Sequence, residues 1–263
     1  MVDYSKEAQK QWEADPTYAE NGRTLTYEEI RKERYKDMPW LPEVLDFKSF
    51  KNKRLLEVGF GRGIELMEFA KAGAEVWGID MSWKHFQFVQ ADLKKNRLQA
   101  NIRISDITEE ELPSGHFNAV YSCGVLHHVK EVDLALANIY RMMKADGEFM
   151  SLVYNRNSIA YWFSFLICSH ILSGRFLRMG LKDSRAYIEW HSKGNNAKTW
   201  VDVYTPEEWK AKLEKAGFRD VQITIRHLTK KDFAMFRHLI PNWLFRKLDE
   251  RKWGWHIIAK CRK

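Results

Sequence analysis

Residues 55–63 read Leu-Leu-Glu-Val-Gly-Phe-Gly-Arg-Gly, and the predicted fold rests on these nine residues. A short apolar run leads into a glycine-rich turn, and an amphipathic stretch follows. Gly59, Gly61 and Gly63 permit φ > 0 and let the backbone approach a ligand closely. The helix predicted after the turn presents free N–H groups to that ligand. The spacing GxGxG differs from the GxGxxG of dinucleotide enzymes, and the GK[ST] of a P-loop is absent.

Outward from this turn, short apolar runs alternate with amphipathic stretches. Strands are expected at 55–58, 75–79, 102–104, 119–121, 148–154, 221–226 and 255–259. Helices are expected at 64–71, 83–96, 132–143 and 206–215. This alternation predicts an α/β fold in which a parallel sheet carries helices on both faces. Before it, Thr26-Tyr-Glu-Glu29 has the form of a capping box and predicts a helix to about Asp37.

The composition is typical of a globular domain and argues against disordered, disulfide-rich and membrane-spanning proteins. The chain has 263 residues, 45% of them apolar, which is enough for one large domain and excludes a disordered chain. Its three cysteines are far apart, so neither a disulfide framework nor a CxxC site is expected. The apolar stretch 161–172 is shorter than the ~20 residues of a membrane-spanning helix. With no leader recognised, a cytoplasmic location is expected.

The net charge of +8 is concentrated near one end of the chain. Residues 226–263 hold 11 Lys and Arg against 3 Asp and Glu. One interpretation is a surface for an anionic partner, either nucleic acid or lipid. The other is a solvated basic face on an amphipathic insertion, with apolar side chains turned inward. Contact with an anionic substrate or a membrane surface stays open on this second interpretation.

Carboxylates stand at three strand ends. Glu57 precedes the first glycine, where it would repel a phosphate but help to hold a cationic amino group. Asp80 ends the second strand, where an acid accepts hydrogen bonds from both ribose hydroxyls. Asp106 follows the third strand and is placed to accept from an adenine amino group. Together they predict a nucleoside ligand that carries an amino group instead of a pyrophosphate.

Five segments between residues 53 and 154 carry a family resemblance. LLEVGFGRG, VWGIDMS, SDITEEELP, FNAVYSCGVLHHV and IYRMMKADGEF together resemble the class I S-adenosylmethionine-dependent methyltransferases of the quinone-biosynthesis (methyltransferase type 11) branch. The resemblance implies one Rossmann-like domain over 51–263, with a mostly parallel seven-stranded sheet whose last strand is antiparallel. It also implies a helical arm or lid over 1–50 and cap insertions at about 155–200 and 228–252. The sequence departs from the family pattern at Phe60, at Arg62 and at the tripeptide Ala145-Asp146-Gly147. None of these departures removes an expected cofactor contact.

The same resemblance implies S-adenosyl-L-methionine as cofactor and S-adenosyl-L-homocysteine as product. The expected cofactor residues are Glu57, Gly59, Gly61, Gly63, Asp80, Met81, Asp106, Ile107, Ser122 and Cys123. Arg34 and Tyr35 close the capped helix of the arm and are expected to reach the cofactor carboxylate. The alternative for these two residues is an ordinary solvated helix face.

Methyl transfer by an SN2 step asks mainly for alignment in a closed, dry, aromatic-rich cavity. A general base is needed only when the nucleophile arrives protonated. Candidate residues are His127, Tyr154, His191 and Tyr204, although His127 and Tyr154 also suit roles in the core. No metal is expected, because the adjacent pair His127 and His128 has no third ligand nearby.

The expected acceptor is a small molecule, anionic or aromatic, whose nucleophile is O, N, S or C. Two other function classes stay open. A nucleic-acid methyltransferase would account for the basic region, but SCGVLHH stands where a [DNS]PP[YFW] motif would grip a flipped base. A non-catalytic S-adenosylmethionine-binding protein is the other class, and the retained insertion argues against it.

Overall fold

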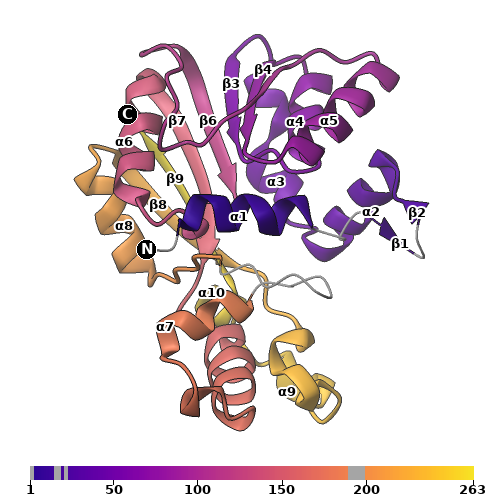
Figure 1. Cartoon of the computed structure of the whole chain (residues 1–263), viewed down its shortest axis with the longest axis vertical. Helices are drawn as coiled ribbons and strands as arrows, with labels where there is room; N and C mark the ends of the chain where they lie inside the picture. Colours follow the sequence, from indigo (N-terminus) through magenta and orange to yellow (C-terminus); the bar gives the residue numbers. More distant parts are fainter. Residues whose placement is uncertain (1–2, 15–18, 21–22, 189–198) are drawn as a thin grey trace.

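The computed structural model describes residues 3–14, 19–20, 23–188 and 199–263, and its centre is one twisted sheet of seven strands (Figure 1). The strand order is β5-β4-β3-β6-β7-β9-β8. The strands are β3 Arg54–Val58, β4 Glu75–Asp80, β5 Asn101–Ile104, β6 Phe117–Cys123, β7 Met143–Tyr154, β8 Arg219–Arg226 and β9 His256–Arg262. Only β9 runs antiparallel to its neighbours within this sheet, so the predicted fold class is confirmed.

Helices cover both faces of the sheet. One face packs against α2 Tyr27–Asp37, α3 Leu41–Leu45, η1 Phe47–Phe50, α4 Ile64–Lys71 and α5 Trp83–Lys95. The other packs against α6 Val132–Met142 and α8 Pro206–Lys215. Successive residues of β3 pack on opposite faces of the sheet. Leu55 lies in the core cluster with α4 and α5, and Leu56 lies in the cluster with α6 and α8. Burial on both sides explains why the central strands read as continuous apolar runs.

The connections create a crevice at one edge of the sheet. From β3 the chain moves outward through β4 to β5, and then returns to β6 on the other side of β3. Parallel strands whose connections diverge in this way leave a ligand-binding crevice at their carboxyl ends. The glycine turn after β3 and the η2 segment Leu126–His128 after β6 both lie at that edge.

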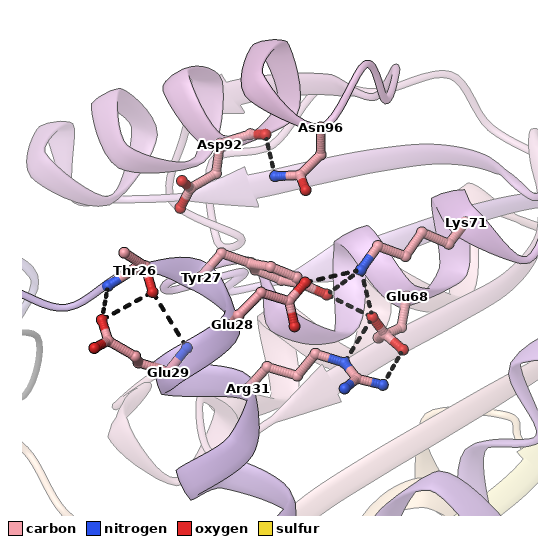
Figure 2. Close-up of polar contacts among 9 residues, drawn as sticks. All are labelled: Thr26, Tyr27, Glu28, Glu29, Arg31, Glu68, Lys71, Asp92 and Asn96. Carbon is pink, nitrogen blue, oxygen red and sulfur yellow. Dashed lines mark hydrogen bonds and ion pairs between the residues drawn. The ribbon is translucent and has the colours of Figure 1, made fainter.

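Helix α2 is fixed to α4 by a polar network that Figure 2 shows. Thr26 and Glu29 form the predicted capping box, with the Thr26 amide 2.8 Å from Glu29 Oε2. The Tyr27 hydroxyl donates to Glu68 Oε1, and Arg31 donates to both oxygens of the same carboxylate at 3.0 and 3.1 Å. Lys71 adds a further donor to Glu68. A helix that is polar around most of its surface is thereby docked by directed charge-assisted hydrogen bonds.

Two segments outside the sheet pack together as a separate lobe, which we call the cap (Figure 1). The first comprises η3 Ala160–Leu172 (a π-helix), η4 Arg175–Leu177, α7 Leu181–Ser184 and η5 Arg185–Ile188. The second comprises η6 Lys230–His238, α9 Asn242–Phe245 and α10 Glu250–Trp253, between β8 and β9. The Phe163 ring joins them, lying 5.8 Å from Phe233 and 5.6 Å from Phe236.

The first fifty residues also contain elements that the sequence patterns did not indicate. Helix α1 Tyr4–Glu13 begins at Asp3, whose side chain accepts from the Lys6 amide. A two-stranded hairpin, β1 Ala19–Glu20 and β2 Arg23–Thr24, precedes α2. No helix in the described part of the chain combines the length and hydrophobicity needed to cross a membrane.

Candidate active site

The glycine turn folds against the loop after β6. Gly59, Gly61 and Gly63 all have positive φ, at 74°, 48° and 68°. A Cβ atom on Gly59 would lie 2.1 Å from Cγ2 of Val125, far inside van der Waals contact. A Cβ on Gly63 would lie 2.8 Å from Cγ2 of Val89. Both the backbone conformation and the space therefore require glycine at these positions.

A cavity of about 570 Å³ opens in front of this turn, at the carboxyl edge of the sheet, and its volume suits a cofactor-sized ligand. Its lining includes seven residues expected at the cofactor: Gly59, Gly61, Asp80, Met81, Asp106, Ile107 and Cys123. Helix α1 and the segment after β6 supply further walls, from Tyr4, Ser5, Ala8, Trp12, Gly124, Val125, His128, Val129 and Leu134.

The Asp80 carboxylate is held in one orientation at the end of β4. Its Oδ2 accepts from the Gly61 amide at 2.8 Å, and its Oδ1 accepts from the Ser82 amide at 2.9 Å. Nδ1 of the buried His85 lies 3.2 Å from Oδ1. A carboxylate oxygen can accept more than one hydrogen bond, so this oriented group retains capacity for a pair of ligand hydroxyls.

The Asp106 carboxylate links the sheet to α1. Its Oδ1 accepts from the Thr108 amide at 2.9 Å and its Oδ2 from the Ser5 hydroxyl at 2.6 Å. Further along α1, Gln9 Nε2 donates to the Met81 carbonyl at 3.1 Å. Figure 1 shows α1 running across the strand ends, so it forms one wall of the cavity. Tyr4, Ala8 and Trp12, spaced by four residues, were the available sequence signal for this helix.

Arg34 and Tyr35, expected at the cofactor carboxylate, lie outside the cavity lining. Arg34 Nε lies 3.0 Å from Glu65 Oε1, and its Nη2 lies 3.1 Å from Cys123 Sγ. The Glu65 carboxylate therefore holds the guanidinium behind Cys123 instead of in the cavity. Burial, followed by the Glu65 and Glu68 charges, raises the pKa of the Tyr35 hydroxyl. Ser122 is fully buried and also does not line the cavity.

Glu57 is a buried carboxyl group beside the glycine turn. Only 2% of its surface is exposed, and its Oε2 has no hydrogen-bond partner. Burial raises its pKa well above the ordinary value; the Glu65 charge raises it further and Arg34 opposes the shift. An orphaned carboxyl here gains most from a nearby cation, because burying an unpaired charge is costly. Glu57 does not itself line the cavity, but the next two residues, Val58 and Gly59, do.

Three of the four catalytic candidates lie outside the cavity lining. His127 is fully buried, neither ring nitrogen has a partner, and its ring centroid is 3.7 Å from that of Tyr154. Burial, then His128 and His256, lowers the pKa of His127 well below its ordinary value. Tyr154 also stacks on Trp255, and the buried Tyr204 packs on Trp209. The fourth candidate, His191, falls outside the described residues.

His128 is the histidine that lines the cavity, and the sequence patterns did not single it out for that role. Its Nδ1 lies 3.0 Å from the Trp200 carbonyl oxygen. A carbonyl only accepts, so Nδ1 carries the hydrogen and Nε2 has the lone pair of the neutral ring. The Trp12 ring meets it edge-on at 5.2 Å. Among the described residues, no cluster of three or more His, Cys, Asp or Glu has the arrangement of a metal site.

Residues 27–223 match a family model described as a methyltransferase domain. This chain belongs to the class I S-adenosylmethionine-dependent methyltransferases. The fold of this methyltransferase is shared with a solved S-adenosylmethionine-dependent methyltransferase from Mesorhizobium loti, at TM-score 0.60, 17% identity, and coverage of 86% of this chain and 97% of that one.

Curated relatives of this methyltransferase include two ubiquinone biosynthesis O-methyltransferases. One, from Alkalilimnicola ehrlichii, is 32% identical over 53% of this chain and 56% of its own length. The other, from Coxiella burnetii, is 25% identical over 74% of this chain and 77% of its own length. The match thus spans little more than half the length of the first relative.

Proposed function

We propose that the chain transfers the methyl group of S-adenosylmethionine to an oxygen atom of a small aromatic acceptor. The observation that carries this proposal is the continuity of one cavity from Asp80 and Asp106 to Trp12 and His128. Its lining combines carboxylates, among them Asp80 and Asp106, with aromatic and aliphatic side chains such as Trp12 and Leu134. The O-methyltransferase names of the relatives support oxygen as the acceptor atom.

The residues present fit the cofactor. Asp80 would hold the ribose hydroxyls, and Asp106 with Ile107 would frame the adenine. The glycine turn would let the methionine portion approach the backbone, with Glu57 as the counter-charge for its ammonium group. S-adenosylmethionine supplies a methyl group already activated on a sulfonium, so the protein's share of the chemistry is positioning. Helix α1 would exclude water from the reacting atoms.

His128 is the proposed general base for a hydroxyl acceptor. It lines the cavity close to Cys123 and Gly124, at the end of β6. With Nδ1 donating to the Trp200 carbonyl, Nε2 is the nitrogen that accepts the acceptor's proton. The orienting carbonyl would hold the ring in the tautomer that general-base catalysis needs. His127 is instead sealed in the core, where its two ring nitrogens have no partner.

A turnover screen with methyl-labelled S-adenosylmethionine tests this proposal. Catechols, other phenols, amines, thiols and carboxylic acids would be supplied in parallel, and products identified by mass spectrometry. We expect methyl ethers from phenolic compounds. Methylated amines, or methylated RNA as the main product, would contradict the oxygen acceptor while leaving the cofactor assignment in place.

The base is tested separately by His128→Gln, with His238→Gln as a matched control on the exposed surface of η6. General-base catalysis contributes about 10²–10⁴-fold, so we expect a rate loss in that range for His128→Gln with phenols. Acceptors that are already deprotonated should lose much less. An equal loss for both acceptor types would assign His128 a packing role.

A further inference from the structure

The cap exposes an unusual number of apolar side chains. In the part of the chain that the structure describes, fifteen large apolar side chains are exposed, and twelve of them belong to 160–188 and 230–253. The most exposed are Leu172 at 62%, Leu177 at 78%, Met235 at 70%, Leu239 at 73% and Trp243 at 63%. Scattered exposed apolar residues are ordinary, but such a concentration in one lobe marks an interaction surface.

The π-helix η3 divides its apolar residues between two sides. Trp162, Ile167 and Ile171 are exposed and lie four or five residues apart, which is about one turn of a π-helix. Tyr161 and Phe165 are buried on the other side. Ring contacts from Phe163 to η6 attach the second cap segment to the same lobe. Figure 1 shows this lobe projecting from the sheet, with α9 and η3 at its far end.

The cap also carries nearly all of the chain's excess positive charge. Its two segments hold eleven Lys and Arg against four Asp and Glu, a net +7 of the total +8. Several of these cations lie over aromatic rings: Arg175 is 4.4 Å from the Tyr187 ring centroid, and Lys247 is 5.2 Å from that of Trp243. Trp and Tyr beside Lys and Arg is the residue mixture enriched at the boundary between lipid headgroups and acyl chains.

We infer that the cap docks on the surface of a lipid bilayer that contains anionic lipids. Apolar side chains that project from short helices among cations match a boundary that is apolar below and anionic above. A second copy of the chain fits worse, because two net +7 lobes would face each other. A polynucleotide would bind the cations but leave Leu177 and Leu239 without apolar contacts. This inference does not depend on the acceptor proposed above.

Vesicle co-sedimentation with the full chain tests the inference. Vesicles of phosphatidylcholine alone would be compared with vesicles that also contain phosphatidylglycerol. We expect binding to the anionic vesicles, weak binding to the neutral ones, and release at high salt, because the attraction to anionic headgroups is screened. Leu177→Ser with Leu239→Ser should weaken binding by at least about tenfold, since two apolar insertions are lost.

Two matched controls accompany this variant. Ile104→Ser changes an exposed apolar residue on the edge strand β5 and should bind like the wild type. Arg178→Glu with Arg246→Glu should clearly weaken the preference for anionic vesicles, whereas Lys48→Glu, an exposed site on η1, should leave it largely intact. The charge variants keep the test available if the serine variants fail to fold.

Three results would overturn the inference. One is equal binding of the wild type to neutral and anionic vesicles, or no binding to either. Another is unchanged binding by both cap variants. The third is evidence for a different partner of the cap. Such evidence would be a dimer in light scattering that Leu177→Ser with Leu239→Ser breaks, or a polynucleotide that binds through the cap and displaces the vesicles.

Discussion

The Ser5 hydroxyl donates a 2.6 Å hydrogen bond to Oδ2 of Asp106, a residue 101 positions further along the chain. This bond joins the first turn of α1 to the segment that follows β5, where Asp106 lines the cavity. Gln9 and Glu13 extend the same attachment to the Met81 carbonyl and the Trp83 amide. The first helix is therefore a wall of the cavity, fixed at three points to the segments that follow β4 and β5.

The first prediction concerns this wall. Deletion of residues 1–14 should speed dissociation of S-adenosylhomocysteine and weaken its affinity by about tenfold, because water enters and apolar contacts from Trp12 are lost. Ser5→Ala should show a smaller change in the same direction. Stopped-flow displacement measures both, with Lys10→Ala on the exposed side of α1 as control. Wild-type dissociation rates in the deletion variant would refute a lid role for α1.

The second prediction concerns the glycine turn. Gly59→Ala should reduce the free energy of unfolding more than Gly115→Ala, although both residues have positive φ. The backbone conformation costs about 1–2 kcal/mol in either case, but only at Gly59 does the new methyl group meet Val125, adding about 1–3 kcal/mol. Urea denaturation measures the difference. Adding Val125→Ala should recover part of the loss; equal losses at the two glycines would contradict the close approach.

The third prediction concerns pH. Burial lowers the pKa of His127 and of His256 in the folded chain, so below about pH 6.5 the unfolded chain binds protons that the folded chain does not. The free energy of unfolding should therefore fall as the pH falls from 7.5 to 5.5. His127→Phe should flatten this dependence by about 1.4 kcal/mol per pH unit at the acid end. A slope unaffected by His127→Phe would show that burial does not lower the pKa of His127.

The fourth prediction concerns the pair between α2 and α4. Arg34→Met leaves the nearly buried Glu65 without its cation, so it should cost about 3–5 kcal/mol of unfolding free energy. Replacing both residues, Arg34→Met with Glu65→Leu, should recover most of that loss. Thermal and urea unfolding measure the two variants. If the double variant keeps its stability but loses cofactor affinity, Arg34 serves the ligand in addition to the fold.

Local sequence patterns were sufficient to predict most strands of the sheet and the helices between them. The apolar run before Gly59 and the capping box at Thr26 each fix an element through nearby residues, and the structure confirms those elements. Asp80 reaches the cavity for the same reason, since a residue that ends a parallel strand lies at the carboxyl edge.

Other parts of the site depend on contacts between distant segments. The role of α1 rests on Ser5 meeting Asp106, which no local pattern encodes. Arg34 is the residue type expected to bind the cofactor carboxylate, but it forms an ion pair with Glu65 on the neighbouring helix instead. For the adjacent pair His127 and His128, only the three-dimensional packing decides which ring enters the core and which lines the cavity.

Calorimetric titration with S-adenosylhomocysteine measures whether the cavity at Asp80 holds the cofactor S-adenosylmethionine. Wild-type chain should bind one equivalent. Asp80→Asn should lose about 1.5–3 kcal/mol of binding free energy, the value of hydrogen bonds to a charged group, while Asp220→Asn, an exposed site outside the cavity lining, should bind like the wild type. Absence of binding heat at several temperatures, together with saturable binding of NAD, would show that the cavity does not hold S-adenosylmethionine.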